Sequence, residues 1–110
     1  MPKIHFEEPS TSKNKVEELK VYEIYHSNGQ LAEKGLIINN KADGVWKKYD
    51  EEGKLLAKTI YQNGSKRGKW IIWDKDGKVI AKGRYNKEGT KSGNWIYWSS
   101  LDDQYLERDF

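Results

Sequence analysis

The sequence contains no cysteine, so it has no disulfide, no thiolate metal ligand and no cysteine nucleophile. Only two prolines occur among its 110 residues, Pro2 and Pro9, and both are near the N-terminus. Hydrophobic residues make up 35% of the chain, and no run of them approaches the roughly 20 residues of a transmembrane helix. The first residues lack an apolar segment of the secretory type, so we expect a cytoplasmic protein.

Residues suited to catalysis or metal binding are also scarce. The two histidines, His5 and His26, stand far apart and have no second ligand at a metal-binding spacing. The carboxylates of Glu51-Glu52 and Asp74-Lys75-Asp76 recur at one position of the chain pattern, which suits a turn better than a calcium site. The glycines match no phosphate-binding loop. We therefore expect no enzyme activity, no cofactor and no metal.

Aromatic side chains are abundant, at 13%, and they recur with a fixed spacing. A pair of aromatics three residues apart returns every 24 or 25 residues, with a glycine two residues before each strong pair and another glycine after it. This period indicates a small supersecondary unit that is copied and stacked. The pairs are Tyr22/Tyr25, Trp46/Tyr49, Trp70/Trp73 and Trp95/Trp98; the preceding glycines are Gly44, Gly68 and Gly93, and the following ones are Gly29, Gly53 and Gly77.

Each unit predicts a β-hairpin. Val45–Tyr49 and Lys54–Tyr61 have the composition of strands, and Asp50–Gly53 between them has acidic residues first and glycine last, as a tight turn requires. The same pattern returns in residues 69–85 and 21–37, and no segment has a helical period. We expect an all-β fold of antiparallel hairpin repeats, forming a twisted open sheet or a short solenoid. The repeat domain spans residues 20–110, after a flexible arm over residues 1–19.

Strand alternation places one lysine of each repeat opposite the small and apolar side chains. Lys34, Lys58 and Lys82 are 24 residues apart and form a predicted ladder of positive charge. Such a ladder suits phosphate groups, of a nucleic acid or an inositol lipid, but it suits better a solvated face that discourages strand addition. Residues 20–100 contain 16 lysines and arginines against 9 aspartates and glutamates, and this modest excess without an arginine cluster argues against a nucleic-acid partner.

Aromatics three residues apart point to opposite faces of a regular strand. One member of each pair is therefore predicted to be core, and the other lies near an edge or on an open face unless a bulge turns it back. The second members, Tyr49, Trp73 and Trp98, are the candidates for contact with a partner.

The C-terminal segment is charged oppositely to the basic repeat body. Residues 101–110 hold four acidic residues and one arginine. They predict either a cap that folds back onto the basic sheet or frays, or a decoy that occupies a basic site on a partner. Asp102 and Asp103 are the candidate contacts in the second case.

The unit G-x-W-x-x-[YW]-x-x-x-G-K-[LV], closed by Y-x-N-G-x-x-x-G-x-W, resembles the bacterial variant of the MORN (membrane occupation and recognition nexus) repeat. It is found in Gly44–Leu55, Tyr61–Trp70 and Gly68–Val79. The resemblance implies an antiparallel sheet of successive hairpins without catalytic residues. The family includes YwqK-type antitoxins, which implies a toxin or effector protein as the partner, neutralised by direct binding. Other members are tied to membranes, phosphoinositides or scaffolding, so a lipid surface and self-association through the open sheet edges are the alternatives.

Overall fold

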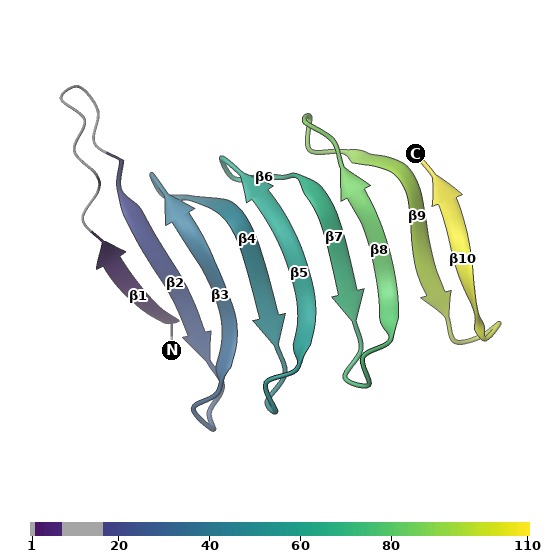
Figure 1. Ribbon diagram of the computed structural model, residues 1–110, viewed down its shortest axis with the longest axis horizontal. Helices are drawn as coiled ribbons and strands as arrows, with labels where there is room; N and C mark the ends of the chain where they lie inside the picture. The colour runs from purple at the N-terminus through teal and green to yellow at the C-terminus, as the bar shows by residue number, and fades with distance from the viewer. Residues whose placement is uncertain (1, 8–16) are drawn as a thin grey trace.

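The computed structural model describes residues 2–7 and 17–110, which form one ten-stranded antiparallel sheet (Figure 1). The strands follow one another in chain order, except that the two-residue β6 pairs with the end of β5 and β7 continues the sheet. The strands are β1 Pro2–Glu7, β2 Leu19–Tyr25, β3 Leu31–Ile38, β4 Lys41–Tyr49, β5 Leu55–Gln62, β6 Ser65–Lys66, β7 Gly68–Trp73, β8 Val79–Tyr85, β9 Lys91–Ser99 and β10 Gln104–Asp109.

The all-β architecture of hairpin repeats that the sequence predicts is confirmed. The predicted strands start and end within one or two residues of the observed ones, except that β4 begins at Lys41. Side-chain hydrogen bonds and a glycine stabilise the turn between β4 and β5. Asp50 Oδ1 accepts hydrogen bonds from the backbone N–H groups of Glu52 and Lys54, at 2.9 and 2.8 Å. Gly53 has a φ of 88°, a left-handed conformation that glycine adopts most readily.

At the N-terminal end, residues 2–7 form β1 and pair with β2 along the whole strand. The sequence analysis predicts a flexible arm over residues 1–19, but these six residues belong to the sheet. The run Lys3–Phe6 alternates polar and apolar residues, which is the period of a strand. Residue 1 and residues 8–16 of the predicted arm lie outside the described residues. Glu17 and Glu18 are described and directly precede β2.

At the C-terminal end, β10 is the last strand of the sheet and pairs with β9 in regular register from Gln104 to Asp109. Most of the acidic segment therefore folds back onto the sheet, as the first of its two predicted arrangements requires. Residues 100–103 form the turn between the two strands.

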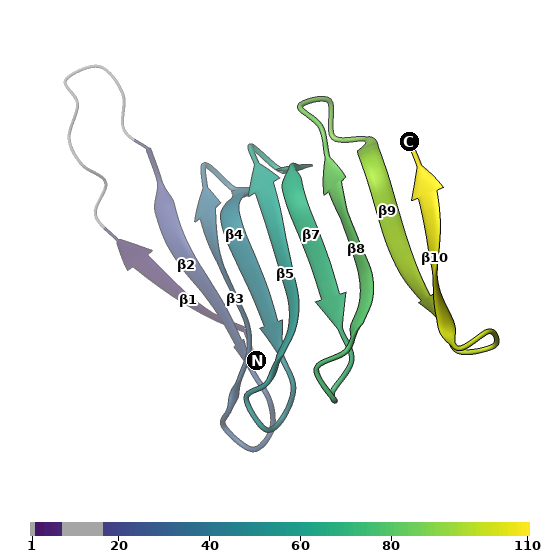
Figure 2. The same cartoon turned by 45° about the vertical axis from the view of Figure 1, so that its right-hand side comes forward.

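The sheet is a single twisted layer (Figure 2). Its extents are 56 × 38 × 15 Å, and its radius of gyration is 16.6 Å, compared with about 13 Å for a compact chain of this length. Among the described residues, only Ala57 and Trp95 are buried hydrophobic residues, with 7% and 4% of their surface exposed. Both faces of the sheet are therefore open to solvent to a degree that is unusual for a folded domain. No helix in the described part of the chain has the length and hydrophobicity to cross a membrane.

One face, here called the aromatic face, carries a continuous row of rings from β2 to the C-terminus. Successive ring centroids lie 5.1 to 6.3 Å apart, mostly in tilted or edge-to-face arrangements. Each such pair adds about 0.5–1.5 kcal/mol beyond the area that it buries. The first aromatic of every predicted pair belongs to this row, which serves as the core. The row consists of Tyr22, Trp46, Tyr61, Trp70, Tyr85, Trp95 and Phe110.

Candidate functional site

The opposite face, here called the lysine face, carries a row of side chains in register across the sheet. Directly paired residues of antiparallel strands lie on the same face, so the strand pairing alone defines this row. Between β2 and β10, the centre of the row is basic and its first and last members are acidic. From β2 to β10 its members are Glu23, Lys34, Lys47, Lys58, Ile71, Lys82, Ile96 and Glu107.

Three lysines stand next to one another at the centre of this row: Lys34, Lys47 and Lys58. None of them has an ion-pair or hydrogen-bond partner within residues 17–110. The Cβ atoms of directly opposite residues are about 4.5–5.5 Å apart, and like charges in such positions repel. These three residues, here called the lysine triplet, therefore form a concentrated positive patch, and Glu23, opposite Lys34 on β2, is the one carboxylate beside it in the row between β2 and β10.

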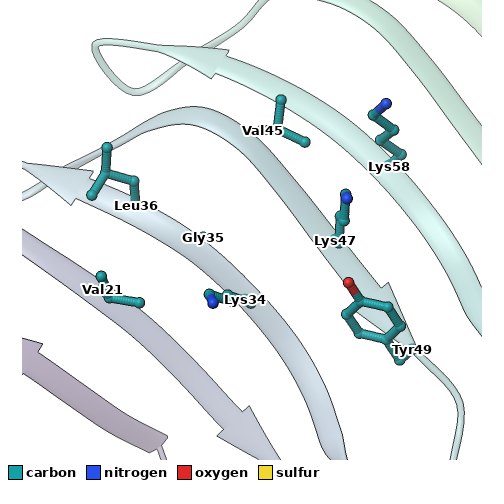
Figure 3. A pocket seen from close by; sticks show the side chains of 8 residues that line it. All are labelled: Val21, Lys34, Gly35, Leu36, Val45, Lys47, Tyr49 and Lys58. Carbon is teal, nitrogen blue, oxygen red and sulfur yellow. The ribbon is translucent and has the colours of Figure 1, made fainter. Parts of the chain in front are cut away.

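A shallow cleft of about 470 Å³ lies among the triplet lysines (Figure 3). The lining between the lysines is apolar and comes from Val21, Leu36 and Val45, on three successive strands. Tyr49, at the end of β4, closes one side with its hydroxyl directed toward Lys47 (Figure 3). An apolar floor with a cationic rim suits a ligand that presents an acidic group together with an apolar one.

Two of the three lysines in the predicted ladder, Lys34 and Lys58, line this cleft. The third, Lys82, is separated from them in the row by Ile71. Lys47, which stands between the other two triplet members in the register, is not part of the predicted ladder. The corresponding residue of the next two repeats is isoleucine, so the repeat pattern gives no reason to expect a lysine there. The signal that could have indicated it is strand alternation: Lys47 follows Trp46 on β4, so its side chain lies on the face opposite the tryptophan.

The three aromatics that the sequence proposes for partner contact belong to separate surfaces. β-Bulges shift the register at Tyr49 and Trp73, whereas the pairing of Trp98 is regular. Tyr49 lines the lysine-face cleft, and Trp73 lines a hollow with residues of the aromatic row. Trp98 packs edge-on against Tyr105 with a centroid distance of 5.0 Å, and the Lys78 Nζ lies 3.1 Å from the centroid of its ring.

The hollow on the aromatic face has a volume of about 570 Å³ and is lined mainly by aromatic and aliphatic side chains, including Trp70 and Trp73. The pKa of the Tyr61 hydroxyl in this hollow is raised, mainly by burial and then by the nearby Glu33 carboxylate. Lys48 lies 3.8 Å from the same carboxylate, so the charges beside the hollow are paired. This surface offers apolar contact area and little charge to select a ligand.

The two predicted acidic contacts, Asp102 and Asp103, lie in the turn between β9 and β10. Asp102 Oδ2 accepts a hydrogen bond from Ser99 Oγ at 3.1 Å, and the backbone N–H of Asp102 donates to Ser99 Oγ at 3.3 Å. Asp103 has a φ of 52°, which aspartate tolerates better than most residues. Both side chains are exposed, and the turn itself accounts for their residue types.

The described residues contain no group of three or more histidine, cysteine, aspartate or glutamate side chains able to hold a metal ion. His26 has a structural contact instead: its Nε2 lies 2.9 Å from the backbone oxygen of Tyr49 and links two successive turns.

Comparison with known proteins identifies the repeat. The family model described as the MORN repeat variant matches residues 19–39, 42–63 and 66–87, which together exceed half of the chain. These segments contain the hairpins β2–β3, β4–β5 and β7–β8 almost completely. No curated protein matches the sequence. One solved chain, from a "Crystal structure of GtfA/B complex bound to UDP and GlcNAc", is similar over 94% of this chain, with 9% identity and a TM-score of 0.40. The match spans 24% of that chain.

Proposed function

Because this chain belongs to the MORN repeat variant family, whose repeats form non-catalytic binding modules, we propose that it binds a partner protein and neutralises it, as an antitoxin or immunity protein does. The partner's contact surface is acidic, and it covers the lysine triplet and the adjoining cleft. The repeat sheet supplies the surface, and no chemistry by this chain is required.

The observation that carries this proposal is the unpaired lysine triplet. Lys34, Lys47 and Lys58 repel one another in the free protein, and the fold supplies no carboxylate between them. An acidic partner removes this repulsion when it binds, so the charge arrangement favours the complex over the free chain. Complementary charge also speeds the encounter of the two proteins and disfavours wrong partners.

The surface area of the chain supports a binding role. Its accessible surface is 7854 Å², compared with about 6,300 Å² expected for a compact monomer of this mass. This open surface is several times the roughly 800 Å² that one partner contributes to a standard protein interface.

The proposal is tested by expressing the protein encoded next to this chain in a host cell, with and without this chain. We expect the neighbour to be toxic, co-expression to relieve the toxicity, and the two proteins to co-purify. Replacing the lysine triplet by serine should abolish both rescue and co-purification. The matched control replaces three exposed lysines elsewhere, Lys41, Lys75 and Lys87, by serine and should retain both. A harmless neighbour that does not bind this chain would overturn the antitoxin proposal.

A membrane-surface module is the second candidate, because the lysine triplet also fits the phosphates of anionic lipids. This function predicts binding to phosphatidylserine vesicles that falls steeply with salt. The triplet-to-serine variant should lose this binding, whereas the control variant should keep it. Absence of vesicle binding by the unmodified chain at low salt would exclude the lipid function and leave the protein partner.

A further inference from the structure

The outer edge of β10 combines free backbone hydrogen-bonding groups with exposed apolar side chains. Among residues 2–7 and 17–110, β10 is the last strand of the sheet and pairs with β9 alone. The described residues include six large hydrophobic side chains that are exposed, and four of them lie in residues 101–110. These four are Leu101, Tyr105, Leu106 and Phe110, with 96%, 42%, 46% and 48% of their surface exposed.

The direction of the free backbone groups follows from one hydrogen bond. The N–H of Phe110 donates to the carbonyl oxygen of Gly93 on the β9 side, at 2.9 Å. In an antiparallel pair, residues with inward-directed and outward-directed backbone groups alternate along each strand. Because β10 is in regular register with β9, the N–H and C=O groups of Tyr105, Glu107 and Asp109 are directed outward.

This edge has only some of the features that protect sheet edges from strand addition. Such edges commonly contain charged residues, lysine above all, or proline or a β-bulge, or are very short. β10 has the charged residues Glu107, Arg108 and Asp109 but no proline or lysine, and its pairing with β9 contains no register shift. By contrast, the pairings β2–β3, β3–β4, β4–β5, β7–β8 and β8–β9 each contain one.

The side chains along this edge indicate what kind of strand it accepts. Glu107 belongs to the row on the lysine face, and Asp109 follows it on the same face by strand alternation. Leu106, Arg108 and Phe110 lie on the opposite face, where Phe110 contacts Trp95 with a centroid distance of 6.3 Å and the Arg108 guanidinium carbon lies 5.2 Å from the centroid of the Phe110 ring. A complementary strand therefore has basic residues on the lysine face and apolar residues on the aromatic face.

We propose that β10 is a docking edge for an extended protein segment that alternates basic and apolar residues and pairs antiparallel with Tyr105–Asp109. The segment continues the sheet by one strand, with its basic side chains beside Glu107 and Asp109 and its apolar side chains beside Leu106 and Phe110. This inference rests on the proposed protein-binding function. It concerns a different surface from the lysine triplet and adds a second point of attachment to the same partner.

The test uses the full chain and two fluorescent octapeptides of alternating lysine and valine, acetylated and amidated at their ends. Residues opposite Tyr105, Glu107 and Asp109 exchange both backbone hydrogen bonds with them, and in the proposed pairing these residues are the lysines. One peptide is N-methylated on its valines, which leaves the N–H groups of the lysines free to pair with β10. The other is N-methylated on its lysines, which removes these N–H donors. Charge, composition and number of methyl groups are the same in both peptides.

Fluorescence anisotropy should show saturable binding of the valine-methylated peptide and binding at least about tenfold weaker for the lysine-methylated one. A Glu107→Pro variant should also weaken binding by about tenfold, because proline removes an outward N–H and is tolerated on edge strands. Glu107→Gln serves as its control for the loss of charge and should bind more tightly than Glu107→Pro. Circular dichroism and thermal unfolding establish that both variants are folded.

Equal binding of the two methylated peptides, or no saturable binding of either, would overturn the proposal. So would a concentration-dependent dimer of the free chain that Glu107→Pro abolishes, because the occupant of the edge would then be a second copy. These outcomes are independent of the co-expression assay. Rescue and co-purification without peptide binding would reject the docking edge alone.

Discussion

The indole ring of Trp95 lies against the backbone of Gly83, its neighbour on β8. A Cβ atom at Gly83 would overlap the ring atoms Cδ2 and Cε2 of this tryptophan. The same relationship joins Trp46 to Gly35 on β3. In these two repeats the tryptophan thus occupies the space of a side chain that the preceding strand lacks.

Gly83→Ala is therefore expected to lower the free energy of unfolding by about 1–3 kcal/mol, because the methyl group forces the indole ring out of its site. Urea denaturation measures this change. Lys82→Ala, on the opposite face of the same strand, is the control and should stay within about 0.5 kcal/mol of the unmodified chain. If the loss comes from overlap of the methyl group with the indole ring, Gly83→Ala should lower the free energy of unfolding much less in a Trp95→Ala chain. An equal loss in both chains would show that the overlap is not its cause.

Trp70 stands in the middle of the aromatic row, between Tyr61 and Tyr85, and its Nε1 donates to the backbone oxygen of Ile60 at 3.2 Å. Trp70→Ala should cost about 3–5 kcal/mol of stability. Trp73 makes no ring–ring contact within residues 17–110. The loss of stability in Trp73→Ala should therefore be at least about 1 kcal/mol smaller than in Trp70→Ala. Thermal and urea unfolding of the two variants check this order. Equal losses would contradict the role of the row as the core.

Lys47→Ile should stabilise the free chain by about 0.5–1 kcal/mol at low salt, because it removes the repulsion with Lys34 and Lys58. Lys82→Ile is the matched control, since its two neighbours in the row are already isoleucines. The two variants gain similar strand propensity, so the difference between them measures the charge effect. This difference should disappear at about 1 M salt, where charges on the surface are screened. A destabilised Lys47→Ile chain would show that the triplet is not repulsive.

Asp50 predicts part of the response to acid. The hydrogen bond from the Lys54 backbone N–H, assisted by the one from Glu52, lowers the pKa of the Asp50 carboxyl in the folded chain. The ionised Asp50 carboxylate therefore stabilises the folded chain. This contribution is fully present above the pKa of the unfolded state, and it is lost as the pH falls through the lower pKa of the folded state. Asp50→Asn retains an oxygen acceptor and should have a weaker loss of stability between about pH 5 and pH 2. Asn86 accepts two backbone hydrogen bonds in the same way in another turn.

Urea midpoints across this pH range test the prediction for Asp50. Glu51→Gln, in the same turn, is the control because no hydrogen bond reaches its carboxylate within the described residues. The control should follow the unmodified chain at every pH. If Asp50→Asn also follows it, the turn carboxylate has no role in acid stability.

The repeat pattern predicted the hairpins because each unit contains a strong turn signal and a tryptophan at a fixed distance from it. It failed where a residue departs from its repeat equivalents. Lys47 replaces an isoleucine of the later repeats, and β1 lies outside the repeated units altogether. The acidic composition of residues 101–110 hid the strand that ends the sheet.

The repeat pattern also does not predict which surface the second aromatic of each pair lines. A bulge adds one residue to a strand, and it redirects the side chains beside it. Tyr49 and Trp73 both follow such register shifts, yet they line clefts with different neighbours. Which cleft each ring enters depends on packing between repeats, and no spacing within one repeat encodes that packing.

The most direct test of the proposed function is the salt dependence of the dissociation constant between this chain and its co-purified partner, for the unmodified chain and for Lys47→Ile. The unmodified complex should weaken steeply as salt rises. Lys47→Ile, although more stable as a free chain, should bind at least about tenfold more weakly at low salt and depend less on salt. Unchanged affinity and unchanged salt dependence of Lys47→Ile would show that the partner does not contact the lysine triplet, and would contradict the proposed binding mode.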